Sequence, residues 1–153
     1  MTEILIKRLS KDVTLPKYET KGSSGLDLAA NTDKQIKILP GKSEIISTGL
    51  AVAIPKNFEI QIRPRSGSAA KNQISVLNTP GTIDADYRGE LKVILINLSD
   101  KSFIVERGLR IAQMVLCPVV KANLREVDTL ENTKRGSGGF GSTGCLLYTS
   151  PSP

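Results

Sequence analysis

Apolar residues recur at every second position in several short segments, and this alternation limits the fold more than any other feature of the chain. Ile36 and Ile38 alternate with polar residues, and the same period of two runs through 50–54 and 58–63. A period of two is typical of strands that bury one face. The segment 91–98 is apolar on both faces, which predicts a central strand, and the apolar run 111–120 predicts another strand.

Turn-forming residues separate these segments along the whole body of the chain. They lie at 40–41, 55–57, 80–81, 99–100 and 107–108. Helical signals are few. The segment 69–73 predicts at most a short helical turn, and the helical spacing of Leu124, Val127 and Leu130 rests on three residues alone. We therefore predict an all-β fold, either a β-sandwich or a jelly-roll-like barrel.

The composition excludes several kinds of chemistry. The chain has no histidine, which removes Ser-His-Asp and Cys-His nucleophile pairs and histidine general bases. Its two cysteines, Cys117 and Cys145, provide neither a disulfide framework nor a CxxC pair. Acid–base chemistry must then come from a carboxylate, a lysine, a tyrosine or a bound metal. The net charge of +6 suits an anionic ligand, and it equally suits plain solubility.

The length of 153 residues predicts about one domain. No window approaches the ~20 apolar residues that a membrane helix requires. The first ten residues mix Glu3, Lys7 and Arg8 with their apolar residues, which argues against a secretory signal. We therefore expect a cytoplasmic protein without a membrane partner.

The composition changes after residue 134. The segment 135–144 contains five glycines and one aromatic residue, Phe140, so it cannot build a core and is expected to be flexible. Its GxGxxG pattern lacks the strand, helix and acidic residue of a dinucleotide site, and no lysine completes a phosphate-binding P-loop. The uncharged segment 145–153 is expected to be an extension outside the functional protein. We thus predict a core at 1–134, an arm at 135–144 and an extension at 145–153.

Four further segments could carry chemistry. The loop 64–69 offers an arginine, two hydroxyls and a glycine directly after a strand, which suits either a phosphate cradle or a surface turn. Asp84, Asp86, a tyrosine and an arginine gather in 78–91, which we expect to form a hairpin, either with a general base or with acids that pair with Arg88 and Lys92. Asp27 stands alone among apolar residues. Gln113 interrupts an apolar run, so it is expected to be hydrogen-bonded if buried.

Taken in order, five segments resemble the five motifs of the homotrimeric dUTPases, which hydrolyse dUTP to dUMP and pyrophosphate. The matching stretches are Gly-Leu-Asp-Leu at 25–28, Pro-Arg-Ser-Gly at 64–67, Gly-Thr-Ile-Asp-Ala-Asp-Tyr-Arg-Gly at 81–89, Arg-Gly-Leu-Arg-Ile-Ala-Gln at 107–113 and the glycine-rich 135–144. The resemblance spans about residues 3–144. It implies an all-β, jelly-roll-like (β-clip) subunit with a flexible C-terminal arm.

The resemblance also implies a role for each matching residue. Asp84 matches the catalytic acid, which deprotonates the water that attacks the α-phosphorus. Asp27 matches a position that supports the metal and its waters without direct coordination. The positions that match substrate-binding residues are Arg65, Ser66, Gly67 and Gln113 for phosphate, Asn78, Gly81, Thr82, Ile83 and Lys92 for uracil, Tyr87 for deoxyribose, and Arg135, Phe140, Gly141 and Ser142 in the arm.

The same resemblance implies a homotrimer whose active sites are shared. One chain would supply the segments around Arg65 and Gln113, a second the segment around Asp84, and the third its arm. The cofactor implied is Mg²⁺, held mainly by the phosphates and water. The substrate implied is dUTP, hydrolysed so that uracil stays out of DNA and dUMP is available for dTMP synthesis, and no nucleic acid is required.

Two other functions fit parts of the pattern. The dCTP deaminases share the fold, but a deaminase would need a glutamate where this chain has the run 84–87 without one. A basic nucleic-acid-binding or regulatory β-module would explain the charge, and its duplex binding would depend steeply on salt. The combination of Asp84, Arg65, Arg135 and Phe140 favours the hydrolase over this binding module.

Overall fold

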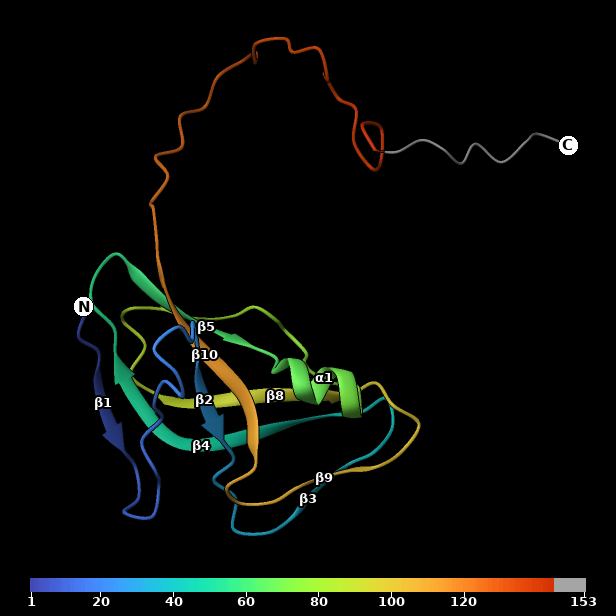
Figure 1. The fold of residues 1–153 in the computed structure, drawn as a ribbon. Coiled ribbons are helices and arrows are strands. Elements are labelled where there is room, and N and C mark those ends of the chain that lie inside the picture. The colour runs from blue at the N-terminus through green and yellow to red at the C-terminus, as the bar shows by residue number, and fades with distance from the viewer. Residues whose placement is uncertain (145–153) are drawn as a thin grey trace, which may run out of the picture. The chain divides into compact units, whose positions relative to one another are not determined.

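Two four-stranded antiparallel sheets enclose the core (Figure 1). This computed structural model describes residues 1–144, so the expected extension at 145–153 lies outside the described residues. The first sheet has the order β1 (Leu5–Arg8), β4 (Ser43–Ala53), β8 (Glu90–Asn97) and β6 (Ile74–Val76). The second has the order β2 (Leu26–Ala29), β10 (Arg110–Pro118), β5 (Phe58–Arg63) and β7 (Gly81–Ile83). A separate pair joins β3 (Ile36–Ile38) to β9 (Phe103–Val105). The predicted all-β class is confirmed.

The chain divides into two units, Met1–Lys121 and Ala122–Pro153. Every strand and the short helix α1 (Ser66–Asn72) belong to the first unit. In the described part of the second unit, 122–144, turns and bends occur but no helix or strand, so the spacing of Leu124, Val127 and Leu130 produces no helix there. The predicted boundary after residue 134 stays a prediction. Within 1–144 no helix is long and apolar enough to cross a membrane.

The longer strands agree with the alternation of the sequence. β5 covers the predicted segment 58–63, and β8 lies between β4 and β6, which confirms a central strand there. β4 is longer than its predicted part at 50–54. The sequence does not predict its first half, because apolar Ile45 on the outer face stands next to apolar Ile46 on the inner face, which breaks the alternation of apolar and polar residues. The helical turn predicted at 69–73 is the end of α1, which begins earlier, at Ser66.

The hairpin expected at 78–91 is wrong in its pairing. β7 pairs with β5 in the second sheet, whereas β8 pairs with β4 and β6 in the first sheet. The segment 84–89 therefore passes from one sheet to the other. As a consequence, Asp84 and Tyr87 lie on a connection between the two sheets rather than at the tip of a two-stranded ribbon.

One hydrophobic cluster fills the space between the sheets. Ile46 and Leu91 reach it from the first sheet, and Leu28 and Ile60 reach it from the second, each almost fully buried. Burying a side chain of this size contributes roughly 1.5–3 kcal/mol to stability. The register is therefore firm, because a slip by one residue would turn these side chains to the solvent.

β4 bends in order to serve two neighbours. Its pairing with β8 is regular at 43–47, shifts before Ala51, and its end then pairs with β1 (Figure 1). Gly49 lies at this shift with a φ of 72°, in the left-handed region that favours glycine. A methyl group there would also lie 2.6 Å from Val13 Cγ2. Gly49 thus permits the bend of β4 and also leaves room for the N-terminal segment to pack closely against it.

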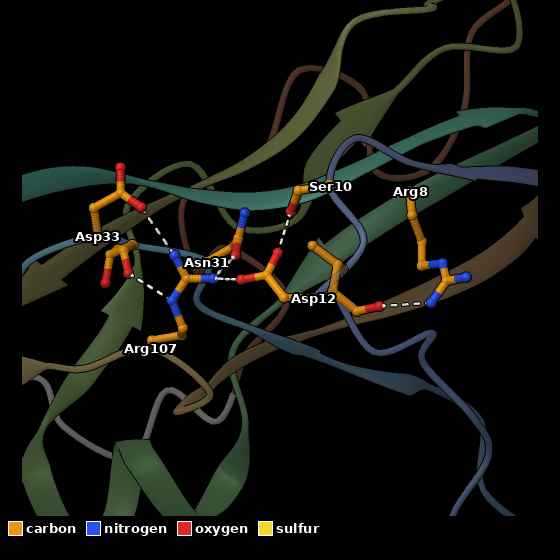
Figure 2. A network of polar contacts seen from close by, with 8 residues as sticks. Arg8, Ser10, Asp12, Asn31, Asp33 and Arg107 are labelled. Carbon is orange, nitrogen blue, oxygen red and sulfur yellow. Dashed lines mark hydrogen bonds and ion pairs between the residues drawn. The ribbon is translucent and has the colours of Figure 1, made fainter.

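Arg107 ties three segments together before β10 begins (Figure 2). Its guanidinium donates to the Thr32 carbonyl at 3.0 Å and to Asp33 Oδ1 at 2.9 Å, and it forms an ion pair with Asp12. A hydrogen bond from Ser10 lowers the pKa of Asp12 below its ordinary value, and the positive charge of Arg107 lowers it further. Such exposed pairs are individually weak, and the network chiefly sets the direction in which the chain enters β10.

We expect Asn97→Ala to lower the free energy of unfolding by about 2–4 kcal/mol, since it would strand several buried polar groups. The fully buried Asn97 amide donates to the carbonyls of Ile38 at 2.9 Å and Lys101 at 2.6 Å, and its Oδ1 accepts from the Ser99 backbone N–H at 2.9 Å. Urea unfolding measures the change. Asn72→Ala, at an exposed asparagine of α1, is the matched control, and an equal loss in both variants would contradict the prediction.

Candidate active site

The predicted site residues of the first unit fall into two groups, and the first surrounds the carboxylate of Asp27. Asp27 lies on β2 with its side chain mostly covered. Its Oδ1 accepts from Arg65 Nε at 3.0 Å, and its Oδ2 accepts from Arg110 Nη1 at 3.2 Å. Arg110 also forms an ion pair with Glu19 at 3.4 Å. One acid therefore holds two guanidinium groups at the same edge of the second sheet.

Gln113 joins this group through the pairing of β10. It lies opposite Asp27 on β2 and opposite Arg63 on β5. Its Nε2 donates to the Pro64 carbonyl at 3.0 Å, which agrees with the expectation that this half-buried amide is hydrogen-bonded. A methyl group on Gly25 would collide with the Gln113 amide, 3.2 Å from Cδ, so the glycine leaves the room that this side chain occupies.

Ser66 and Gly67 follow Arg65 directly and open α1, and both are exposed. The first backbone N–H groups of a helix have no acceptor within the helix. Arg65 precedes the helix in an extended conformation and gives no side-chain cap to it. Arg65, Ser66 and Gly67 therefore present a guanidinium, a hydroxyl and unpaired amide hydrogens on one short segment.

The second group lines a hollow of about 160 Å³. Its lining consists of Thr82, Ile83, Asp84, Tyr87 and Lys92, all predicted site residues, together with Glu90. The Tyr87 hydroxyl donates to the Glu90 carbonyl at 2.9 Å. Gly81 begins β7 beside Asn78, whose Nδ2 would lie 3.1 Å from a methyl group at Gly81. The structure thus brings the predicted uracil, sugar and catalytic positions into one neighbourhood.

Asp84 is exposed and has no ion pair within residues 1–144. Arg88, its nearest candidate partner in the sequence, donates instead to the carbonyls of Ala85 at 2.6 Å and Tyr87 at 3.0 Å. The interpretation of this segment as a set of mutually paired charges is therefore wrong for Asp84. Its carboxylate oxygens are available to a water molecule or a ligand.

Asp84 and Arg65, one from each group, lie toward opposite ends of β5. The pairing of Ile60 with Ile83 and of Ile62 with Gly81 places Asp84 beyond the position opposite Ile60, next to the start of β5. Arg65 lies two residues beyond its other end. The four steps from Glu59 to Arg63 alone span about 13 Å at roughly 3.3 Å per residue. Within one chain Asp84 and Arg65 therefore cannot meet on a single phosphorus atom.

The remaining predicted residues lie in the second unit, within its described segment 134–144, which contains tight turns. Arg135 Nε donates to the Gly138 carbonyl at 2.7 Å, and the Ser142 N–H donates to the Gly139 carbonyl at 3.1 Å. Phe140 is fully exposed. Phe140 and Gly141 have φ values of 51° and 93°, which turn the backbone sharply at the aromatic residue. An exposed aromatic ring thus follows a cation by five residues, with glycines on both sides of it.

Sequence reasoning missed two residues that the structure places at these groups, Arg110 and Glu90. Arg110 stands 83 residues from its partner Asp27, and only the pairing of β10 with β2 brings them together. The available signal was the place of Arg110 within the motif at 107–113, at the start of the strand that also contains Gln113. As for metal ligands, no three His, Cys, Asp or Glu side chains in the described residues are arranged to hold an ion.

Comparisons with known proteins agree on one family. A family model described as dUTPase matches residues 11–144. The deoxyuridine 5'-triphosphate nucleotidohydrolase of Rickettsia bellii (strain OSU 85-389) is 54% identical over 148 residues, which cover 96% of this chain and 99% of the relative. The dUTPase of Staphylococcus bacteriophage 80alpha with dUPNHPP superposes with a TM-score of 0.83 at 27% identity, over 94% of this chain and 99% of the other.

A more distant neighbour bears on the fold alone. A variant of the dUTPase from phage phi11 of S. aureus superposes with a TM-score of 0.76 at 21% identity, over 85% of this chain and 99% of the other. That protein coordinates a structural Mg(II) ion. The two antiparallel sheets described above therefore recur in proteins whose sequences have diverged widely.

Proposed function

The chain belongs to the dUTPase family and hydrolyses dUTP to dUMP and pyrophosphate, and we propose that it does so with Asp84 as the general base in sites that three copies share. The observation that carries this assignment is the position of Asp84. It is an exposed carboxylate without an ion pair in the described chain, beside Tyr87 and Lys92 in one hollow. The absence of histidine from the sequence leaves a carboxylate as the natural acceptor of a proton from water.

Asp84 would orient a water molecule and take its proton as the oxygen attacks the α-phosphorus. The bond from the α-phosphorus to the bridging oxygen then breaks, and pyrophosphate leaves. A positioned general base of this kind contributes about 10²–10⁴ to the rate. The surrounding residues must hold the α-phosphorus in line with that water, since little of the chemistry falls to any other side chain.

The geometry of β5 supports a site assembled from different copies. Asp84 and Arg65 lie toward opposite ends of the strand, so each chain offers two half-sites that face different neighbours. Repeated head-to-tail contacts of this sort close into a ring when the rotation permits. We propose a homotrimer in which one chain contributes Arg65 and Gln113, the next contributes Asp84, and the third contributes its arm.

The group around Asp27 would bind the phosphates. Arg65, Ser66 and Gly67 offer charge-assisted and amide hydrogen bonds, and Gln113 lies beside them. Asp27 would hold the arginines in place and face the waters of Mg²⁺. The Asp27 carboxylate already accepts from Arg65 and Arg110, which fits an ion that is bound chiefly by phosphate oxygens and water. When bound, Mg²⁺ withdraws charge from the phosphate oxygens.

The hollow around Tyr87 would bind the nucleoside. Asn78, the backbone from Gly81 to Ile83 and Lys92 would read the uracil edge, where a fixed donor pattern rejects cytosine strongly because buried polar groups would be left unpaired. Tyr87 would lie against the deoxyribose and leave no room for a 2'-hydroxyl. In the arm, Arg135 would contact the triphosphate, Phe140 would stack on uracil, and Gly141 and Ser142 would reach the distal phosphates.

We expect Tyr87→Ala to raise UTP hydrolysis relative to dUTP hydrolysis by up to about 10²-fold, since an added hydroxyl is otherwise weakly rejected. Pyrophosphate release from dUTP, UTP, dCTP and dTTP, measured in parallel for both proteins, tests this and the assignment of the substrate together. The wild type should act on dUTP alone. An unchanged ratio of dUTP to UTP would remove Tyr87 from sugar selection, and turnover of dCTP with ammonia release would indicate a deaminase instead.

A further inference from the structure

Gly89 lies directly under the ring of Tyr87. A methyl group built on its Cα would lie 2.6 Å from Tyr87 Cζ and 2.9 Å from Cε1, and would also collide with the hydroxyl oxygen. Carbon atoms that are not bonded pack at about 3.5–4.0 Å. The tyrosine ring in its present place therefore occupies the volume that any side chain at position 89 would need.

Two hydrogen bonds, one from the ring hydroxyl and one from the backbone, hold Tyr87 in that place. At its tip the hydroxyl donates to the Glu90 carbonyl at 2.9 Å, and at its base the Tyr87 N–H donates to the Asp84 carbonyl at 3.1 Å. Glu90 is itself fixed to the first sheet, because it pairs with Ala51 and its Oε1 accepts from the Gly49 N–H at 3.2 Å. The ring thus bridges the connection between the two sheets, with Gly89 as the floor beneath it.

The backbone of Gly89 gives no other reason for a glycine. Its φ lies outside the left-handed region, unlike that of Gly49 or Gly108, so an alanine meets no backbone strain there. Gly89 is exposed, and, its chain neighbours aside, the three atoms nearest to the added methyl all belong to Tyr87. Tyr87 is itself 43% exposed, so its ring can swing away instead of unfolding the chain.

We infer that Gly89 is a positioning residue for sugar selection: because it has no side chain, the Tyr87 ring can occupy this volume, and Gly89 thereby sets the position of the ring that separates deoxyribose from ribose. This inference rests on the proposed role of Tyr87. A larger residue at 89 would lift or tilt the ring, and the surface offered to C2' of the sugar would move with it. Gly89 itself contacts the substrate in no step.

The test is the ratio of kcat/KM for dUTP to kcat/KM for UTP in the wild type and four variants. We expect Gly89→Ala to lower this ratio about tenfold or more, in the same direction as Tyr87→Ala. Gly22→Ala is the matched control, since Gly22 has open space around it and no left-handed φ, and its ratio should equal that of the wild type. In the double variant Tyr87→Ala/Gly89→Ala the ratio should equal that of Tyr87→Ala alone, because residues that act through one contact are not additive.

The outcomes separate the proposed role of Tyr87 from the inference about Gly89. If Tyr87→Ala leaves the ratio unchanged, the proposed role of Tyr87 is wrong. If Tyr87→Ala lowers the ratio and Gly89→Ala does not, the inference about Gly89 is wrong, and it is equally wrong if Gly89→Ala still changes the ratio when the ring is absent. Should Gly89→Ala fail to fold, recovery of folding in the double variant would support a collision with the ring, and continued unfolding would overturn it.

Discussion

Asp84→Asn is expected to lower kcat for dUTP hydrolysis by about 10²–10⁴-fold while binding of the nonhydrolysable analogue dUPNHPP persists. The amide has the shape of the carboxylate but cannot accept the proton of the attacking water. In energetic terms the loss corresponds to about 3–5 kcal/mol at the transition state. Pyrophosphate release at saturating dUTP gives kcat, and titration with the analogue gives the affinity.

The chain supplies a close control for this variant. Asp86 is also an exposed acid on the connection between β7 and β8, two residues away, and has no assigned part in the reaction. Asp86→Asn should therefore retain activity. Because Asp84 has no ion pair in the described structure, neither variant should change the urea midpoint appreciably. Retained turnover in Asp84→Asn, or an equal loss in both variants, would contradict the assignment of the general base.

Mixing two inactive variants is expected to restore activity. Asp84→Asn lacks the base, and Arg65→Ala lacks a phosphate contact whose charge-assisted bond contributes about 1.5–3 kcal/mol. If each site takes Arg65 from one chain and Asp84 from its neighbour, random mixing in equal amounts leaves about one quarter of the sites with both residues intact. Refolding the two variants together should therefore yield about a quarter of the wild-type rate.

The controls for the mixing experiment are the two variants refolded separately and then combined without exchange. Those samples should keep only the residual rates of the single variants. Arg65→Ala should still fold, because Asp27 keeps its contact with Arg110 at 3.2 Å. If the co-refolded sample shows no gain, Asp84 and Arg65 act within one chain or in no common site, and the shared assembly is wrong.

The parts of the fold that the sequence predicts are those with a repeating local signal. β5 and β8 are long enough for their alternation, or for apolar character on both faces, to be read directly. β6, β7 and β9 are three residues each and are not predicted, although β3 is equally short and its alternation is recognised, and they are defined by the hydrogen bonds that a neighbouring strand offers them. The pairing of β7 with β5 rather than with β8 depends on contacts between residues that are distant in sequence. Local patterns do not reveal such contacts, so the sequence predicts a hairpin at 78–91 that the structure does not contain.

The site shows the same division. Thr82, Asp84, Tyr87 and Lys92 are close in sequence as well as in space, so their grouping follows from the order of the chain. Arg110 and Glu90 acquire meaning only through tertiary contacts, one with Asp27 and the other with Gly49. Gly89 is the extreme case, since a residue without a side chain shows its purpose only when the neighbouring ring is in place.

The length of β5 has a consequence for how this chain can change during evolution. An inserted residue between Phe58 and Arg63 would turn Ile60 or Ile62 out of the core, because side chains alternate along a strand. In the proposed homotrimer it would also displace Arg65 in one site and Asp84 in the next, so a single insertion would damage two sites at once. β5 can therefore accept substitutions by side chains of similar volume, but its length should not vary. We expect natural variants of this chain to have no insertions or deletions within β5.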